Sequence, residues 1–147
     1  MSQANPLQTT TYLMVITAKA QRALVSSTIK DMGLHIGQER LLMELWRQDG
    51  LTQTELSERL CIEPPTLTKM LSRLEKTQLL EKRKDLEDAR ISRVYLTEKG
   101  SSFQEPITNL WLELEEQILA NLSLEERTLY RRFLMQIYEN IKQTAQK

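Results

Sequence analysis

The chain has 147 residues, of which 27% are charged and 40% apolar, and its formal net charge is zero. This length can bury one core, so one compact unit is expected. No run approaches the roughly 20 apolar residues of a membrane span, and the polar segment from Met1 to Thr11 lacks the apolar core of a secretory signal. The single cysteine excludes an intramolecular disulfide, and we therefore expect a cytoplasmic protein.

Composition and charge distribution narrow the class further. Gly, Pro and Phe are scarce while Leu, Glu, Gln, Arg and Lys are abundant, which favours a mostly α fold. Between Thr66 and Lys99, nine Lys and Arg stand against six Asp and Glu, whereas the rest of the chain has eleven against fourteen. The modest positive excess is therefore concentrated in one central segment, which suits contact with an anionic partner.

Two helices are predicted before residue 50. Between Leu7 and Met32, apolar or small residues recur at spacings of three and four up to Gly33, at Leu13, Ile16, Ala20, Leu24 and Ser27. A second helix from Gln38 to Gln48 stops at Asp49-Gly50, and it carries Leu41, Leu42, Leu45 and Trp46 on one side.

A helix-turn-helix pattern follows. Thr52 and Glu55 have the spacing of a capping box, which starts a short helix that buries Leu56 and Leu60. Pro64 and Pro65 suit a first helical turn, and a further helix is predicted from Thr66 to Gln78, with Leu67, Met70, Leu71 and Leu74 inward. This places six polar residues on its outer face: Thr66, Thr68, Lys69, Ser72, Arg73 and Lys76.

A basic β-hairpin is predicted next. Residues 80–84 can pair with a strand containing Val94 and Leu96, and the polar loop Asp85–Ala89 projects between them as a wing. The hairpin carries five cations: Lys82, Arg83, Lys84, Arg90 and Arg93. An arginine at a wing tip suits the narrow minor groove, and Asp88 is close enough to orient Arg90. For the polar face of the preceding helix, the alternative is an ordinary solvated surface. For Asp88 and Arg90, it is an exposed salt bridge within a turn.

Two C-terminal helices complete the prediction, one from Phe103 to Asn121 and one from Leu124 to about Gln143. Pro106 falls in the first turns of the former, and Ser123 with Glu126 forms a second capping box ahead of the latter. Together with the N-terminal helix, they present more apolar surface than one small winged domain can cover. A second copy of the chain is therefore expected to cover the remainder.

The run from Thr52 to Gly100 resembles the multiple antibiotic resistance regulator (MarR) family of dimeric bacterial transcription factors. The matching segments are Leu56-Ser57-Glu58-Arg59-Leu60, Pro65-Thr66-Leu67-Thr68-Lys69, Leu74-Glu75-Lys76, Asp88-x-Arg90 and Val94-x-Leu96-Thr97-x-x-Gly100. Three positions depart from the family pattern: Gln78 replaces a usual helix-ending Gly, Leu86 a common Pro, and Ala89 a frequent second Arg. Because Gln disfavours the left-handed conformation, a less sharp helix end is expected at Gln78.

The resemblance implies a winged helix-turn-helix at residues 37–100, flanked by dimerisation helices at 1–36 and 101–147. It places Thr66, Thr68, Lys69 and Arg73 in the major groove, with Asp88 and Arg90 at the wing tip. The residues expected to form the DNA-binding surface are Thr52, Gln53, Pro65, Thr66, Thr68, Lys69, Arg73, Lys82, Asp88, Arg90 and Arg93. The partner is double-stranded DNA with a pseudo-palindromic operator.

Other reactive residues receive weaker assignments. Cys61 is expected to be a small buried thiol, although nearby Arg59 leaves redox sensing as an alternative. His35 has no His/Cys cluster around it, so neither a metal site nor a cofactor is expected. The resemblance allows Trp46 and Trp111 to line an effector pocket.

The leading hypothesis is a homodimeric, sequence-specific transcriptional regulator, a repressor that a small-molecule effector releases from DNA. A winged-helix module that binds another protein is the alternative from a different class. An enzyme is not expected, because the chain has one His, one Cys and no Gly-rich phosphate loop.

Overall fold

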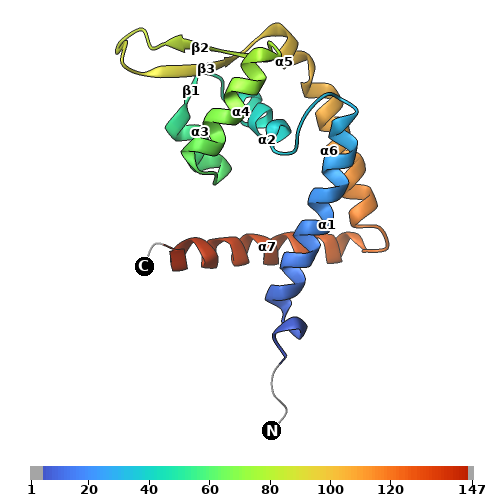
Figure 1. Ribbon diagram of the computed structural model, residues 1–147. Helices are drawn as coiled ribbons and strands as arrows, with labels where there is room; N and C mark the ends of the chain where they lie inside the picture. Colours follow the sequence, from blue (N-terminus) through green and yellow to red (C-terminus); the bar gives the residue numbers. More distant parts are fainter. Residues whose placement is uncertain (1–4, 146–147) are drawn as a thin grey trace. The chain divides into compact units, whose positions relative to one another are not determined.

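The computed structural model describes residues 5–145, which form two compact units divided after Glu105 (Figure 1). The first unit contains a short 3-10 helix η1 (Pro6–Gln8), α1 (Thr10–Lys30), α2 (Gln38–Arg47), β1 (Leu51–Thr52), α3 (Gln53–Leu60), α4 (Pro64–Lys76), β2 (Leu80–Lys84), β3 (Ser92–Leu96) and α5 (Glu98–Ser102). α6 (Gln104–Ile118) crosses the division within its first turn, and α7 (Leu124–Ala145) follows it. Among residues 5–145 no helix has the length and apolar character needed to cross a membrane.

The helix-turn-helix has the predicted order and its own core. Leu41, Leu42 and Leu45 of α2, Leu56 of α3, and Leu67, Leu71 and Leu74 of α4 are all buried. The capping box at the start of α3 is confirmed: the Thr52 hydroxyl accepts from the Glu55 amide at 3.2 Å, and the Glu55 carboxylate accepts from the Thr52 amide at 2.8 Å. α4 begins at Pro64, two residues earlier than expected, because proline lacks only an amide hydrogen that a first turn leaves unpaired.

The sheet has three antiparallel strands in the order β1-β3-β2, and sequence reasoning missed β1. Leu80 pairs with Leu96 and Lys84 with Ser92, which confirms the predicted hairpin. On the other edge of β3, Leu51 pairs with Val94 and Thr52 with Arg93. The central strand therefore joins the wing to the residue that caps α3.

The Leu-Thr-x-x-Gly ending fixes the base of the wing. The Thr97 hydroxyl donates to the Gln78 carbonyl at 2.7 Å and accepts from the Gly100 amide at 3.0 Å. A Cβ atom at position 100 would lie 1.9 Å from the carbonyl oxygen of Leu79, so only glycine fits here. The Gly100 carbonyl in turn accepts the indole N–H of Trp46 at 3.2 Å.

Two helix ends differ from expectation. The helix predicted from Phe103 to Asn121 is observed as α6, Gln104–Ile118, and a short helix that was not predicted, α5, precedes it and ends at Ser102. Pro106 has no amide hydrogen to donate back to residue 102, which favours a break at this point. Gln78 has φ 60, so it adopts the left-handed conformation, although glutamine was expected to disfavour that conformation. Its amide donates to the Glu75 carbonyl at 2.9 Å and helps to close the helix.

The second unit is dominated by α7, a helix with no buried residue. The predicted capping box is confirmed, since the Glu126 carboxylate accepts the Ser123 amide at 2.8 Å and the Ser123 hydroxyl accepts the Glu126 amide at 3.2 Å. The large apolar residues of α7 are exposed or half-buried, namely Leu124, Leu129, Tyr130, Phe133, Leu134, Met135, Ile137, Tyr138 and Ile141. This helix therefore presents an apolar surface that its own unit does not cover.

Candidate nucleic-acid interface

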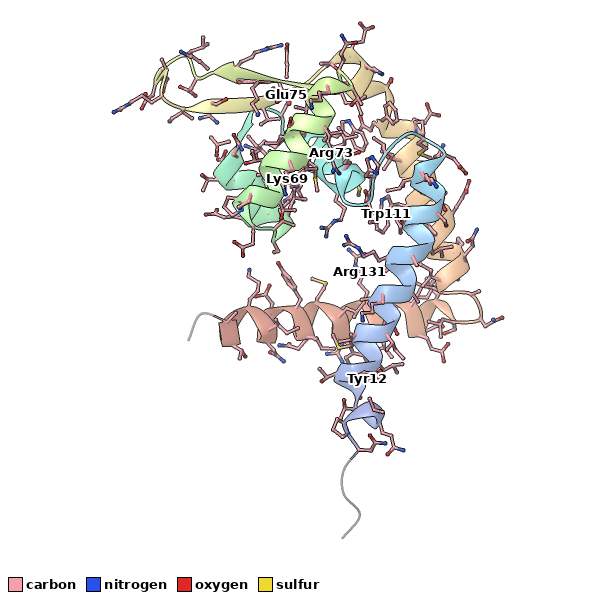
Figure 2. The ribbon with its side chains drawn as sticks, viewed as in Figure 1. Tyr12, Lys69, Arg73, Glu75, Trp111 and Arg131 are labelled. Carbon is pink, nitrogen blue, oxygen red and sulfur yellow. The ribbon has the colours of Figure 1, made fainter. Side chains whose placement is uncertain are left out.

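One face of α4 is polar, cationic and exposed. Thr66, Lys69 and Arg73 recur at spacings of three and four, so they lie along one side of the helix, and Figure 2 labels Lys69 and Arg73 there. Pro65 and Thr68 are also exposed, and the Thr68 hydroxyl donates to the Pro64 carbonyl at 2.9 Å. Hydroxyl and cationic groups at the N-terminal half of such a helix are suited to base edges and phosphates in a major groove.

The wing tip holds Arg90 in a fixed orientation without covering it. Asp88 accepts from Nε and Nη2 of Arg90, both at 3.0 Å, and from the Arg90 backbone amide at 3.0 Å. These hydrogen bonds lower the pKa of Asp88 and keep its carboxylate ionised. The Arg90 side chain nevertheless stays 90% exposed. Since a guanidinium has five N–H donors, this geometry leaves Nη1 available to a ligand.

Three of the four hairpin cations below the tip, Lys82, Arg83 and Arg93, are paired with carboxylates of the protein. Lys82 lies 3.0 Å from Glu75 of α4, and Arg83 is bound by Glu81 on its own strand. Arg83 also stacks over the ring of Tyr95, with 4.8 Å between the guanidinium carbon and the ring centroid. Of the five predicted wing cations, Arg90 is therefore the one that combines high exposure with a fixed orientation.

Arg93 was predicted to bind DNA, but its guanidinium is bound within the protein. Nε donates to Asp85, and Nη1 donates to the Gly50 carbonyl at 3.0 Å. Sequence reasoning placed Asp85 in the wing loop without giving it a role. The only available signal was an acidic residue at the end of β2 and a basic residue eight positions later.

Thr52 and Gln53, the other predicted DNA contacts, lie at the N-terminal end of α3 and are half-buried. Thr52 is the N-cap residue, and its hydroxyl oxygen accepts the Glu55 amide. The structure thus gives Thr52 a local role in starting α3. Gln53 is the first residue of this helix.

Cys61 is exposed, so the expectation of a buried thiol is wrong. The residue follows α3 in the left-handed conformation, with φ 53, and the chain reversal turns the following Ile62 inward instead. Arg59, which was considered as a partner of a thiolate, is bound elsewhere: Nη2 donates to Gln48, and Nη1 lies 3.5 Å from Glu44. The structure therefore gives the redox hypothesis no activating group from Arg59.

A cationic cavity of about 250 Å³ opens beside α4 within the first unit. Arg22, Arg40, Lys69 and Arg73 contribute positive charge to its lining, and Ile36, Ile62 and Met70 contribute apolar surface. The cavity also includes His35, which sequence reasoning considered only as a metal ligand. Trp46 and Trp111, the predicted effector-pocket residues, are not among its lining residues. Trp46 instead donates its indole hydrogen to Gly100.

A buried carboxylate is hydrogen-bonded to the lining of this cavity. Glu39 is 1% exposed, and it accepts the amide of Gly37, a residue of the cavity lining, at 2.7 Å. Burial raises the pKa of Glu39, while the two backbone amides and the nearby arginines Arg40 and Arg22 oppose that rise. Glu39 thus holds the loop between α1 and α2 in place behind the cationic surface.

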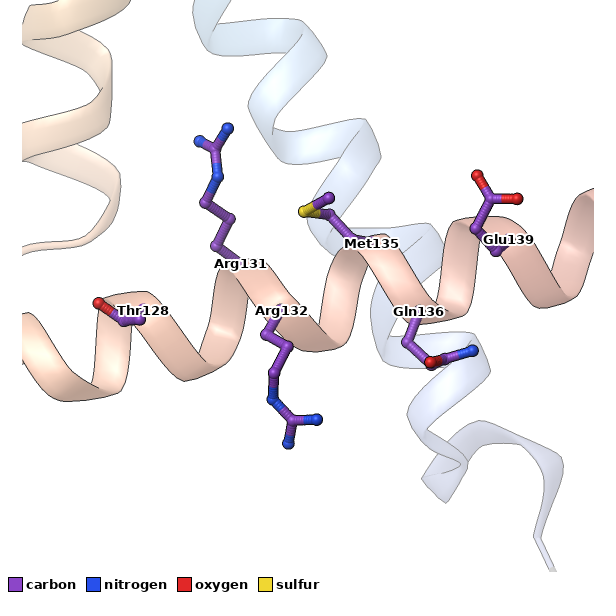
Figure 3. A pocket seen from close by; sticks show the side chains of 6 residues that line it. All are labelled: Thr128, Arg131, Arg132, Met135, Gln136 and Glu139. Carbon is purple, nitrogen blue, oxygen red and sulfur yellow. The ribbon is translucent and has the colours of Figure 1, made fainter.

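A further hollow lies on α7, and Figure 3 shows its six lining side chains. All of them come from this one helix. Arg131, Met135 and Glu139 point to one side of it, and Arg132 and Gln136 point to the opposite side. This hollow is an open helix surface without opposing walls, and such a surface is suited to packing against another chain rather than to enclosing a small ligand.

The two helices at the turn, the exposed polar face of α4 and the arginine-tipped hairpin together define a winged helix-turn-helix of the DNA-binding type. Comparison with known proteins identifies the family. Residues 34–92 match the model of the MarR family. The uncharacterized HTH-type transcriptional regulator YwoH of Bacillus subtilis (strain 168) is 32% identical over 112 residues, which are 74% of this chain and 81% of that protein.

Solved structures agree with the fold. The MarR protein from Peptoclostridium difficile DA00132 has a TM-score of 0.88 and 23% identity, covering 98% of this chain and 95% of that one. A crystal structure of the S. aureus MepR–DNA complex has a TM-score of 0.81 and 24% identity, covering 93% of this chain and 99% of that one. The chain belongs to the MarR family, and its family and fold are those of transcriptional regulators rather than enzymes. It is a MarR-family transcriptional regulator with a DNA-binding winged helix.

Proposed function

We propose that this regulator is a homodimeric repressor that binds a pseudo-palindromic operator and is released by a small anionic effector. The observation that carries the DNA-binding part is the wing tip, where Asp88 orients an arginine that stays 90% exposed. A side chain that is both oriented and accessible loses less conformational entropy when it binds than a free one does. The MepR–DNA complex supports the same use of this fold.

The contacts with DNA divide between two elements. Thr66, Thr68, Lys69 and Arg73 on α4 contact the major groove, and Arg90 enters the adjacent minor groove. Asp88 holds Arg90 in position and does not itself approach the phosphates. The two clusters lie on one chain and give one half-site.

Dimerisation follows from uncovered apolar surface in both units. On α1 the side chains of Leu13, Val15, Ile16 and Leu24 are exposed, and α7 buries none of its residues. Helices of this length with an uncovered apolar stripe gain stability mainly by packing against another helix. A second copy of the chain supplies that surface and repeats the half-site with two-fold symmetry.

The cationic cavity beside α4 is the proposed effector site. Four cations and three apolar side chains in the lining fit a flat aromatic carboxylate, whose charge would pair with Arg40 and whose ring would contact Ile36 and Met70. Thr66, Lys69 and Arg73 belong both to the cavity lining and to the proposed DNA face. A bound anion would neutralise these cations and weaken DNA binding. The size of this effect is set by how much more tightly the anion binds the free protein than the DNA-bound protein.

The DNA-binding proposal is tested by selecting operators from a random duplex pool and then comparing variants on the selected sequence. Arg90→Ala is expected to weaken binding by about tenfold or more, and to reduce the slope of log affinity against log salt by about one. Arg47→Ala, which removes an exposed cation from the last turn of α2, is the matched control and should leave both quantities unchanged. An unchanged affinity of Arg90→Ala across the salt titration would overturn the wing assignment.

The effector proposal is tested with benzoate and its neutral counterpart benzamide. Benzoate should release the operator at millimolar concentration and benzamide should not, because only the acid carries the charge that the cavity complements. Arg40→Gln should abolish the response while leaving operator affinity without benzoate unchanged. Equal release by both compounds, or an unaltered response in Arg40→Gln, would contradict a site at this cavity.

A further inference from the structure

The guanidinium of Arg93 is bound from three separate parts of the first unit. Arg93 lies on the central strand β3, and its Nε donates to Asp85, the first residue after β2. Its Nη1 donates at 3.0 Å to the carbonyl of Gly50, in the loop before β1, and lies 4.0 Å from the carboxylate of Glu55 on α3. The side chain is 32% exposed, against 90% for Arg90.

Asp85 connects this guanidinium to the wing tip. One carboxylate oxygen accepts the backbone amides of Glu87 at 2.9 Å and Asp88 at 3.0 Å, and the other accepts from Arg93. The Asp85 side chain is 14% exposed. Its own backbone amide donates to the Ile91 carbonyl at 2.9 Å and closes the loop. A single carboxylate therefore sets the path of the backbone that carries Asp88.

On the side away from the wing tip, the contacts of Arg93 reach the start of α3. The Glu55 oxygen that lies 4.0 Å from Arg93 is the oxygen that accepts the Thr52 amide in the capping box. Thr52 is also the residue that pairs with Arg93 between β1 and β3. Continuous contacts thus run from the N-terminal end of α3 through Arg93 and Asp85 to Asp88, which in turn holds Arg90.

The neighbouring strand provides an internal comparison. Arg83 on β2 stands directly opposite Arg93, and two like charges at paired positions repel unless each has its own counter-ion. Arg83 is bound by Glu81 two residues earlier on the same strand, and its side chain is 59% exposed. Its contacts stay within the hairpin, whereas those of Arg93 leave it for Gly50 and Glu55. Of these two opposed arginines, Arg93 is therefore the one that ties the wing to the helix-turn-helix.

We infer that Arg93 and Asp85 are positioning residues, which fix the wing against the start of α3 so that Arg90 enters the groove at a set place relative to α4, and that Arg93 does not itself contact DNA. This inference rests on the proposed role of Arg90. It replaces the expectation, drawn from sequence, that Arg93 is a DNA-binding residue. The two roles make opposite predictions for the removal of Asp85.

The first test is Asp85→Asn, measured as operator affinity by fluorescence anisotropy. This change removes a negative charge and frees the Arg93 guanidinium. If Arg93 were a phosphate ligand, the variant would bind DNA at least as tightly as the unmodified protein. A positioning role predicts the reverse, a weakening of about fivefold to tenfold. Unchanged or tighter binding by Asp85→Asn would overturn the inference.

The second test is a double-mutant cycle of Arg93→Gln and Arg90→Ala. If Arg93 acts through Arg90, Arg93→Gln weakens binding by about fivefold to tenfold alone and has little further effect once Arg90 is absent. A loss that persists in full in the Arg90→Ala protein, together with a lower salt slope, would mark Arg93 as a direct DNA contact. Arg83→Gln is the matched control, and its effect should be independent of Arg90.

Two readouts separate the possible failures. Thermal unfolding of each variant checks that the fold is retained, and the amide resonance of Asp88 reports whether the wing loop has moved. In Arg93→Gln and Asp85→Asn, that resonance should shift, and in Arg83→Gln it should not. If Arg90→Ala alone leaves affinity unchanged, the proposed wing function is wrong. If Arg90→Ala weakens binding but the cycle shows no coupling, only the positioning role is wrong.

Discussion

The winged region and α7 carry similar apolar repeats, yet they use them differently. In α4, Leu67, Leu71 and Leu74 are buried by neighbouring elements of the same unit. In α7, Leu129 and Phe133 are still 48% and 49% exposed. The spacing of apolar residues therefore identifies which face of a helix is to be covered, but not whether the same chain covers it.

The winged region and α7 are therefore stabilised in different ways. The winged region holds its shape through contacts within one chain, including the Thr97–Gly100 turn and the Asp85–Arg93 ion pair. The apolar face of α7 gains its stabilisation only when another surface removes it from water. Changes in α7 should therefore alter assembly, whereas changes in the winged region should alter local folding.

The largest expected effect is on assembly. Phe133→Glu places a charge in the exposed apolar face of α7, and it should convert a dimer into a monomer. Operator affinity should fall on the order of 100-fold or more, because the two half-sites would no longer be bound through one linked molecule. Light scattering after size-exclusion chromatography measures the assembly, and anisotropy measures the affinity.

The matched control for this change is Gln143→Glu, which adds the same charge at an exposed polar position of α7. It should remain dimeric and bind DNA normally. A Phe133→Glu protein that stays dimeric would show that another surface joins the subunits. If the unmodified protein is already monomeric, α7 is not covered by a second chain, and the proposed contrast between the two regions is wrong.

The next largest effect lies within the winged region. Gly100→Ala would bring a Cβ atom to 1.9 Å from the Leu79 carbonyl, and the backbone must shift to relieve this contact. The free energy of unfolding should fall by about 1–3 kcal/mol, the usual cost of overpacking a close contact. Gly33→Ala is the control, since nothing lies within 4 Å there and only its left-handed φ of +76 opposes alanine. Equal losses for the two variants would contradict the close approach at Gly100.

Much of this architecture was predictable from local sequence patterns. The two capping boxes, the prolines at the start of α4 and the alternation in the hairpin each depend on residues within a few positions of one another. The Asp88–Arg90 pair could be predicted for the same reason. Local spacing suffices where the interacting groups are neighbours in the chain.

The features that were missed depend on contacts between residues far apart in the sequence, or on elements too short to show a pattern. β1 has two residues, too few to show alternation, and it pairs with a strand about 40 positions later. The internal contacts of Arg93 are with the Gly50 carbonyl, 43 residues away, and with Asp85 in the closed wing loop. The exposure of Cys61 depends on its own left-handed conformation at the end of α3, which no glycine indicates in the sequence. The proposed DNA contacts themselves stay predictions.

A smaller effect concerns the ionisation of the wing. The hydrogen bond from Arg93, followed by those from the Asp88 and Glu87 amides, lowers the pKa of Asp85 from 3.8 to about 2. Its contribution to wing order is therefore complete above pH 3.8, and it is lost as the pH falls through about 2. The amide resonances of Glu87 and Asp88 should titrate with a midpoint near that lower value.

Replacing Arg93 by Gln removes the largest cause of this shift. The midpoint should then move upward towards 3.8, while Arg83→Gln should leave it in place. An unmodified protein whose wing amides titrate at the ordinary carboxyl value would show that Arg93 does not bind Asp85 in solution. The winged region would then be stabilised less by contacts within one chain than the comparison with α7 requires.

The smallest effect is a gain in stability at the end of α4. Gln78 has φ 60, a conformation that costs an L-residue with a side chain roughly 1 kcal/mol and costs glycine little. Gln78→Gly should therefore raise the free energy of unfolding by about 0.5–1 kcal/mol, measured by urea denaturation at one protein concentration. Asn121→Gly, at φ 69 after α6, should gain less, because asparagine adopts this conformation more readily. If Gln78→Gly were destabilising, the Gln78 side chain would have to make contacts that outweigh its backbone strain, and the end of α4 would depend on more than local backbone geometry.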